Sequence, residues 1–186
     1  MKYVMSVRQE IADHWHYRNP PVNSVFANDD AFAAFYTSKY LIQDTAEAVN
    51  THMQKGFSPD PMAAYIEFWG VMQALFIQQD AVVELHNSIC GTIPTLPASS
   101  PWFDLRDLRN RCAGHPANKG AKGGVLRSFM GRNFGSYPRV TFEQYDSVRS
   151  AITHPTVDLL TTIQFYDQQA GGVLLTALTE LKRKCP

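Results

Sequence analysis

The sequence is poor in cysteine, lacks a long hydrophobic run and has no excess of charge of either sign. Its three cysteines, Cys90, Cys112 and Cys185, form an odd set without the spacing of a zinc site, which argues against a secreted disulfide scaffold. No segment approaches the roughly 18 consecutive apolar residues that a membrane-spanning helix needs. The first fifteen residues also lack the apolar core of a signal peptide. We therefore expect a cytoplasmic protein that does not enter a membrane.

The residues that are present suffice for one folded domain. Apolar residues make up 45% of the 186 residues and aromatic residues 12%, which argues against disorder. A chain of this length can build one well-packed core and is short for two. It contains no internal repeat, low-complexity tract or composition shift that would mark a boundary. The sequence therefore predicts a single domain over residues 1–186.

Two long segments show the three- and four-residue spacing of apolar side chains that is typical of amphipathic helices. The first helix is expected over 29–54, with Asn28 as its N-terminal cap and Gly56 as its stop. The second is expected over 60–88 and ends at Gly91. These two segments are the strongest structural signals in the chain.

The remaining elements are shorter or less regular, and residues 1–18 fit either a strand or a helix. Because most connections are short, neighbouring helices are expected to run antiparallel. The predicted fold class is all-α, a compact antiparallel bundle of four to five helices with a small β-hairpin insertion after the short helix. The other expected elements are a short helix from Pro101 to Gly114, a loop over 117–124, a hairpin whose strands 125–132 and 138–142 flank Asn133–Tyr137, and a final helix over 156–184 with a kink or close contact at Gly171–Gly172.

Charge is distributed unevenly along this neutral chain. Residues 104–139 contain eight basic and two acidic residues, whereas residues 1–103 contain five basic and ten acidic ones. Guanidinium and ammonium groups beside glycines are suited to binding phosphate. The basic segment can equally be a solvated surface. Its positive charge would then be balanced by salt bridges to two acids of the second helix, Asp80 and Glu84. On the first interpretation, the candidate RNA- or phosphate-binding residues are Arg106, Arg111, Lys119, Lys122, Arg127 and Arg132.

A short motif lies inside the basic segment, in the stretch LRDLRNRCAGHP over residues 105–116. Arg109 is followed by Asn110, and five residues separate Arg109 from His115. This arrangement resembles the signature of the HEPN family, in which an arginine, usually followed by a polar residue, precedes a histidine by about four to six residues. The family's fold is a helical bundle with the motif on a late helix, and the expected helix order agrees with it. The polar stretch Ile77–Ala81 also resembles a patch seen in some HEPN-like proteins.

The resemblance implies a metal-independent endoribonuclease that needs no cofactor. RNA cleavage of this kind needs a group that moves a proton of the ribose 2′-hydroxyl or leaving oxygen, and cationic donors around the transition state. His115 is the candidate for proton transfer because an imidazole titrates near neutral pH. Arg109 is the candidate phosphate ligand, and Asn110 would orient the phosphate or ribose. HEPN proteins usually form homodimers in which two motifs face each other, so a composite site is expected. A toxin-like or defence-related role, held in check by an inhibitory protein partner, fits this activity.

Several alternatives remain open on the sequence. On a continuous α-helix, residues 109 and 115 point about 120° apart, whereas Arg111 and His115 share a face, which makes Arg111 a rival to Arg109. Arg109 can also simply pair with Asp104 or Asp107. The domain can then be a nonenzymatic module that binds nucleic acid, nucleotide or a protein through the basic surface, or a plain dimerisation domain.

Other reactive side chains form no convincing second site. Cys112 lies in the motif, where a neighbouring arginine can lower the pKa of its thiol, but no acid orients a Cys–His pair. His52, His86 and His154 lie on separate segments and are expected at the surface or at helix caps. No metal site is expected, because the spacing of cysteine, histidine and acidic residues matches no metal-binding pattern.

Overall fold

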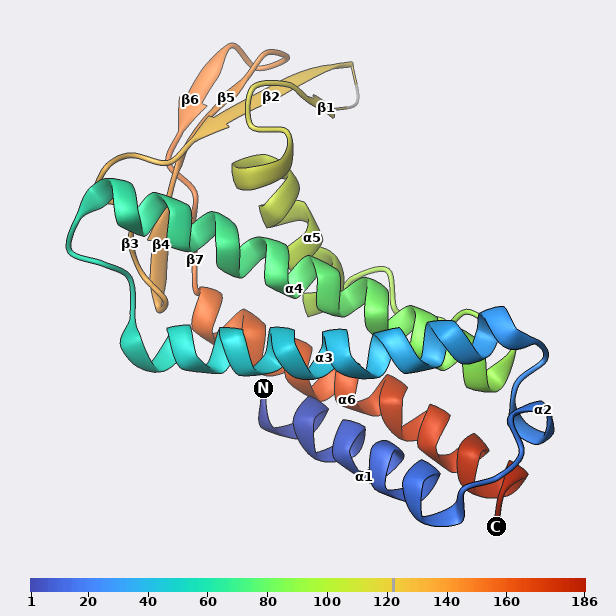
Figure 1. Cartoon of the computed structure of the whole chain (residues 1–186). Coiled ribbons are helices and arrows are strands. Elements are labelled where there is room, and N and C mark those ends of the chain that lie inside the picture. The colour runs from blue at the N-terminus through green and yellow to red at the C-terminus, as the bar shows by residue number, and fades with distance from the viewer. Residues whose placement is uncertain (122) are drawn as a thin grey trace.

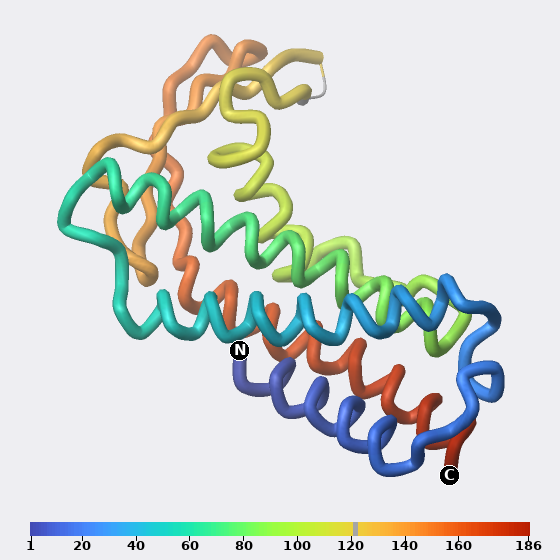
Figure 2. The backbone as a smooth tube through the Cα atoms, viewed as in Figure 1, coloured from blue at the N-terminus to red at the C-terminus, as the bar shows by residue number. Residues whose placement is uncertain are grey.

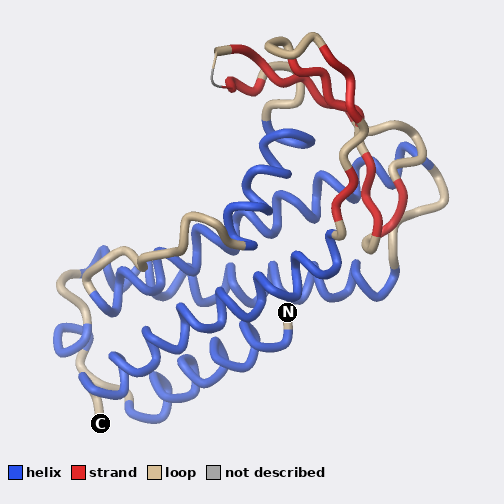
Figure 3. Tube along the Cα trace, turned by 180° about the vertical axis from the view of Figure 1, so that it is seen from behind, coloured by secondary structure: helices blue, strands red, loops and turns tan. Residues whose placement is uncertain are grey.

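The computed structural model (Figure 1) describes residues 1–121 and 123–186, so the candidate ligand Lys122 lies outside the described residues. Helices form a bundle, and the strands gather at one end of it (Figures 1 and 3). The described helices are α1 (Lys2–Arg18), α2 (Val22–Val25), α3 (Asp29–Lys55), α4 (Pro61–Cys90), α5 (Pro101–Arg109), the π-helical turn η1 (Asn110–Gly114) and α6 (Leu159–Lys184). The described strands are β1 (Lys119–Ala121), β2 (Gly124–Phe129), β3 (Gly135–Ser136), β4 (Arg139–Thr141), β5 (Glu143–Asp146), β6 (Ala151–Thr153) and β7 (Thr156–Val157).

The two long helices begin and end where their capping residues predict. The side-chain oxygen of Asn28 accepts a hydrogen bond from the Ala31 amide at 2.8 Å at the start of α3, and Gly56 ends that helix. Asp60 caps α4 by accepting from backbone amides of its first turn, and Gly91 ends it in the left-handed conformation. The predicted helices over 29–54 and 60–88 are thus confirmed.

The first and last long helices lie side by side and run in the same direction (Figures 1 and 2). Asp167 of α6 accepts a hydrogen bond from the backbone amide of Tyr3, and farther along both helices Lys182 lies 3.8 Å from Glu10. Gly171 leaves no room for a side chain beside the Tyr3 ring, so the expected close contact at the glycine pair is confirmed. The prediction that neighbouring helices run antiparallel holds for α3 and α4 but is wrong here, because the long segment before α6 returns the chain to the end where α1 begins.

The strands form two antiparallel sheets, ordered β1-β2-β5-β6 and β3-β4-β7 in the described part of the chain. The predicted hairpin is wrong, because β2 pairs with β1 and β5, whereas β4 pairs with β3 and β7. Residues 119–121 form a strand instead of the expected loop. The final helix begins at Leu159, after the cap Asp158, because residues 156–157 belong to β7.

The all-α prediction is therefore wrong, since two sheets accompany the helices. The physical reason is the length of the strands, which range from two residues in β3 to six in β2. Such short strands bury few side chains and show no sustained alternation of apolar and polar residues, which is the pattern by which strands are recognised. Long-range pairing, as between β4 and β7, decides their structure.

The helix that carries the motif is held in the core by one aromatic side chain. Trp102 of α5 is 2% exposed, and its ring centroid lies 5.4 Å from that of Tyr166 on α6. Its carbonyl oxygen accepts from the buried Gln79 side chain at 3.0 Å, and its amide donates to Gln169 at 3.2 Å. These contacts attach the start of α5 to both α4 and α6, so the end of α5 projects toward the sheets from a fixed base.

Candidate functional site

The motif lies where α5 changes from α-helical to π-helical geometry. After Arg109 the turn η1 closes with the His115 amide donating to the carbonyl oxygen of Asn110 at 2.9 Å, a bond to the fifth preceding residue. Single π-helical turns of this kind are rare and occur frequently at functional sites. The wider turn places Asn110 and His115 on successive turns. The chain then leaves helical geometry at His115, as Gly114 and Pro116 predict.

The guanidinium of Arg109 folds back over this turn. It donates to the side-chain oxygen of Asn110 at 3.1 Å and to that of Gln73 at 3.2 Å, and its central carbon lies 4.5 Å from the Phe76 ring centroid. It also lies against Gly114, where an added Cβ would stand 2.5 Å from a guanidinium nitrogen. Arg109 therefore contacts both Asn110 and the residue before His115.

Arg109 has no carboxylate partner among the described residues, so the simple ion pair with Asp104 or Asp107 is not formed. Its polar partners, Asn110 and Gln73, are neutral amides. Arg109 and Asn110 are thus in side-chain contact, and the Arg109 guanidinium is held only by neutral groups. His115 is linked to Asn110 through a backbone hydrogen bond, and its side chain is exposed.

Three of the candidate phosphate-binding residues are instead paired with acids. Arg106 pairs with Asp80, as expected for a basic segment offset by α4, and Asp107 pairs with both Arg111 and Lys119. Arg111 also lies with its guanidinium carbon 5.5 Å from the Phe142 ring centroid. These contacts neutralise Arg111, and they weaken its case as the rival of Arg109.

The two remaining described candidates have a different environment. Arg127 lies on β2 and Arg132 in the loop that follows, and both side chains are exposed. Neither forms an ion pair within the described ranges 1–121 and 123–186. The described candidate residues therefore divide into those paired with acids, Arg106, Arg111 and Lys119, and those without a carboxylate partner, Arg109, Arg127 and Arg132.

Cys112 is a buried structural residue of the motif. Its carbonyl oxygen accepts from the Trp69 indole at 3.2 Å, and its side chain is 2% exposed. Burial raises the pKa of the Cys112 thiol to about 12, outweighing the nearby Arg111. The hypothesis that an arginine lowers this pKa is wrong, and a Cys–His nucleophile has no thiolate to use.

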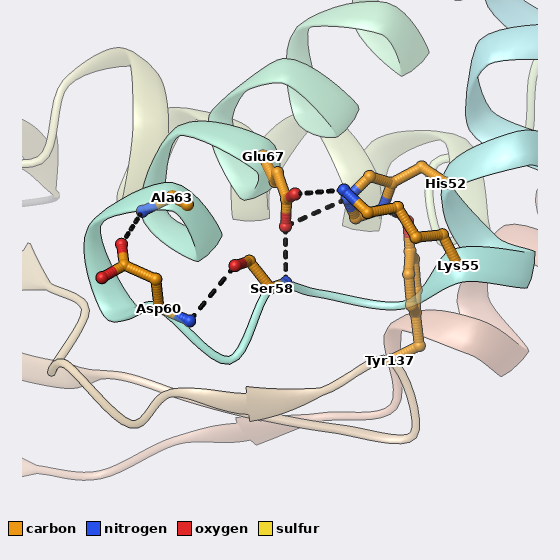
Figure 4. A network of polar contacts seen from close by, with 7 residues as sticks. All are labelled: His52, Lys55, Ser58, Asp60, Ala63, Glu67 and Tyr137. Atoms are coloured by element: carbon orange, nitrogen blue, oxygen red, sulfur yellow. Dashed lines mark hydrogen bonds and ion pairs between the residues drawn. The ribbon is translucent and has the colours of Figure 1, made fainter.

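A polar network at the α3–α4 turn had no counterpart in the sequence analysis (Figure 4). His52 lies 2.7 Å from the Tyr137 hydroxyl through Nδ1 and 3.4 Å from Glu67 through Nε2, so it is not a surface or cap residue. Glu67 accepts from Lys55 at 2.7 Å and from the Ser58 amide at 2.6 Å, and these bonds lower the pKa of its carboxyl to about 2.

The location of this network indicates a structural role. Tyr137 lies between β3 and β4, so its contact with His52 attaches the three-stranded sheet to α3. Burial raises the pKa of Tyr137, which keeps its hydroxyl protonated. No sequence signal points to a contact between residues 85 positions apart. His86 is likewise buried, with Nδ1 2.8 Å from the Thr92 carbonyl oxygen, whereas His154 is exposed as expected.

Comparison with known proteins gives the chain no relative. No family model, no curated protein and no solved structure matches it. Across the described residues, no group of three or more histidine, cysteine, aspartate or glutamate side chains could hold a metal ion, and no helix is long and apolar enough to cross a membrane. The motif residues and their geometry are therefore the features that bear on function.

Proposed function

We propose that the protein is a metal-independent endoribonuclease of the HEPN type whose reacting groups are Arg109, Asn110 and His115. The observation that carries this proposal is the π-helical turn. It places His115 one turn beyond Asn110, and Arg109 folds against the same turn at Gly114. A continuous α-helix would separate residues 109 and 115 by about 120°.

The chemistry follows from the state of each side chain. Arg109 holds only neutral amide acceptors, and an anionic phosphate is the stronger partner for a guanidinium, so the two can form paired hydrogen bonds. The exposed imidazole of His115 can take the proton of the ribose 2′-hydroxyl as this oxygen attacks the phosphorus. The bond from phosphorus to the 5′ oxygen breaks, the 5′ oxygen receives a proton, and the products carry a 2′,3′-cyclic phosphate and a 5′-hydroxyl.

Two proton transfers favour a site built from two copies of the chain. One His115 can take the proton of the 2′-hydroxyl, and the His115 of a second copy can give a proton to the 5′ oxygen. An exposed apolar row on α4, formed by Met62, Ile66 and Trp69, continues to Gln73, which contacts Arg109. A second copy packed by two-fold symmetry on this row would bring its own motif close to the first.

The first test is the cleavage of a mixed RNA pool by the purified protein in excess EDTA. We expect cleavage that resists the chelator, because the proposed groups are organic side chains. The products should carry 2′,3′-cyclic phosphate ends, and a substrate with 2′-deoxyribose at the cleaved position should stay intact. Loss of cleavage in EDTA, or equal cleavage of the deoxy substrate, would contradict the proposed mechanism.

A second prediction concerns Gly114. Gly114→Ala places a methyl group where the Arg109 guanidinium lies, and should displace that group without changing any charge. We expect cleavage to fall by about 100-fold, the effect of misplacing a reacting group by about 1 Å. The measurement is single-turnover cleavage, with Gly172→Ala as the matched control because nothing lies within 4 Å of a Cβ at that helical position. Equal rates for the two variants would show that the position of Arg109 does not matter.

The unneutralised arginines around the sheet also support a second candidate function. A nonenzymatic module that binds nucleic acid would use the same basic surface, since phosphate contacts alone give affinity without cleavage. In that case Arg109→Ala would weaken RNA binding, His115→Ala would change little, and no chelator-resistant cleavage would be found.

A further inference from the structure

The four-stranded sheet has an outer face with exposed aromatic side chains. Arg127, Tyr145 and Ile152 are direct neighbours on β2, β5 and β6. Phe129, two residues after Arg127, lies on the same face because side chains alternate along a strand. Phe129 is 55% exposed, Tyr145 36% and Ile152 60%. We call these four residues the outer face of the sheet.

The opposite face of this sheet is covered by the motif. Ser128 is buried, its amide donates to the Pro116 carbonyl oxygen at 2.7 Å, and Lys119 pairs with Asp107 of α5. Figure 3 shows the sheet standing beyond the end of the helical bundle. The outer face therefore lacks a covering element within the described part of the chain. A cluster of exposed aromatic and aliphatic side chains is typical of a binding surface.

Charge indicates what binds there. Residues 119–153 contain six basic and two acidic residues. Of the two acids, Asp146 lies 3.8 Å from Arg149, and Glu143 lies 3.4 Å from His154. Arg127, which neighbours both Phe129 and Tyr145 on the outer face, has no carboxylate partner among the described residues. An unneutralised arginine between exposed aromatic rings suits a polyanion that carries flat apolar groups.

We propose that the outer face binds single-stranded RNA, with bases stacked on Phe129 and Tyr145 and a phosphate paired with Arg127. Aromatic side chains on a sheet bind unpaired bases in this way, because every base has a face to stack, whereas the bases of a duplex are already stacked on one another. This inference rests on the proposed ribonuclease function and specifies that the RNA substrate is single-stranded.

The sheet is connected closely to the motif. The Asn118 amide donates to the His115 carbonyl oxygen at 3.3 Å, and β1 begins at Lys119. A strand of RNA held on the sheet is thus bound by the same rigid unit that carries His115. A second copy of the chain fits this face less well, because a two-fold axis through it would bring the two Arg127 side chains together.

The test measures binding of a fluorescently labelled oligouridylate of about 12 nucleotides to the full chain carrying His115→Ala, which prevents cleavage. Phe129→Thr and Tyr145→Thr remove the rings and keep strand-forming residues. Each should weaken binding by about 5- to 100-fold. Arg127→Gln should lower the slope of log affinity against log salt by about one. Matched controls are Tyr17→Thr and Arg18→Gln on α1, where an 83% exposed tyrosine stands beside an arginine.

Four results would overturn the inference. One is no binding of the oligouridylate, and the second is binding that Phe129→Thr and Tyr145→Thr leave unchanged although far-UV circular dichroism shows a folded protein. The third is loss of self-association in sedimentation without loss of RNA affinity, which would make the outer face a protein interface. Tighter binding of duplex RNA would also contradict it.

The same variants separate this inference from the proposed catalysis. In the chain with His115 intact, the sheet variants should raise KM and leave kcat unchanged, because they remove binding shared by the ground and transition states. Suppose that the chain with His115 intact does not cleave RNA, but the Phe129 and Tyr145 substitutions still weaken RNA binding. The proposed catalysis is then wrong, and the proposed RNA binding by the outer face is supported. If the sheet variants still cleave RNA and their KM is unchanged, the proposed RNA binding by the outer face is wrong and the proposed catalysis is supported.

Discussion

Replacing His115 with alanine is expected to lower the rate of RNA cleavage by about 10²- to 10⁴-fold, the usual contribution of a general acid or base. The imidazole is exposed, and no hydrogen bond of its side chain occurs within residues 1–121 and 123–186. Its removal should therefore leave the free energy of unfolding within about 0.5 kcal/mol of the wild type. The measurement is single-turnover cleavage in excess EDTA, together with a urea titration of both proteins.

The matched control for this experiment is His16→Ala, which removes an exposed histidine from α1. This control should cleave at the wild-type rate. Wild-type cleavage by His115→Ala would remove His115 from the mechanism. If RNA still bound and Arg109→Ala weakened that binding, the nonenzymatic module would be the better account of the protein.

Replacing Trp102 with alanine is expected to destabilise the protein by about 3–5 kcal/mol. The indole is 2% exposed and packs against Tyr166, and no neighbour in the close-packed core can fill the space it leaves. A domain of this size is stable by only about 5–15 kcal/mol. The variant should therefore unfold at a much lower urea concentration, and cleavage should fall with it because α5 carries Arg109.

The next residue along α5 supplies the control. Phe103 is 41% exposed, so Phe103→Ala should change the free energy of unfolding by about 1 kcal/mol or less. Equal destabilisation by the two substitutions would mean that α5 is not docked through Trp102. If the slope of unfolding free energy against urea concentration is the same in both variants and the wild type, the shifts in urea midpoint report stability alone.

The long helices could be predicted from the sequence because their signals are local. Apolar periodicity and the caps Asn28 and Asp60 lie within a few residues of the helices that they define. The strands could not be predicted in the same way. β4 pairs with β7, although β5 and β6 of the other sheet lie between them in the chain. β4 has only three residues and β7 only two. Nothing within a two-residue strand records its partner.

The candidate site could likewise be predicted only where its signals are local in the sequence. The order of Arg109, Asn110 and His115 is visible in the sequence, but a π-helical turn is not, because the residues of η1 are equally compatible with a continuing α-helix. The i to i+4 spacing of Asp107 and Arg111 permits their ion pair, whereas the contact of Asp107 with its second partner, Lys119 of β1, depends on the tertiary structure. Tertiary structure thus decided which basic residues remain without a carboxylate partner.

The parallel contact of α1 with α6 has a consequence for folding during synthesis. Val4, Val7 and Ile11 of α1 are buried, and Asp167 binds the amides of Tyr3 and Val4. A chain leaves the ribosome at about 5–20 residues per second, so α1 is exposed for several seconds before α6 exists. During that time α3 and α4 can form their local hairpin, and α1 can already contact α3, as Arg8 does by donating to the Lys39 carbonyl oxygen, but its contact with α6 cannot yet form. α1 is therefore made before the other described helices but is among the last of them to be fully packed.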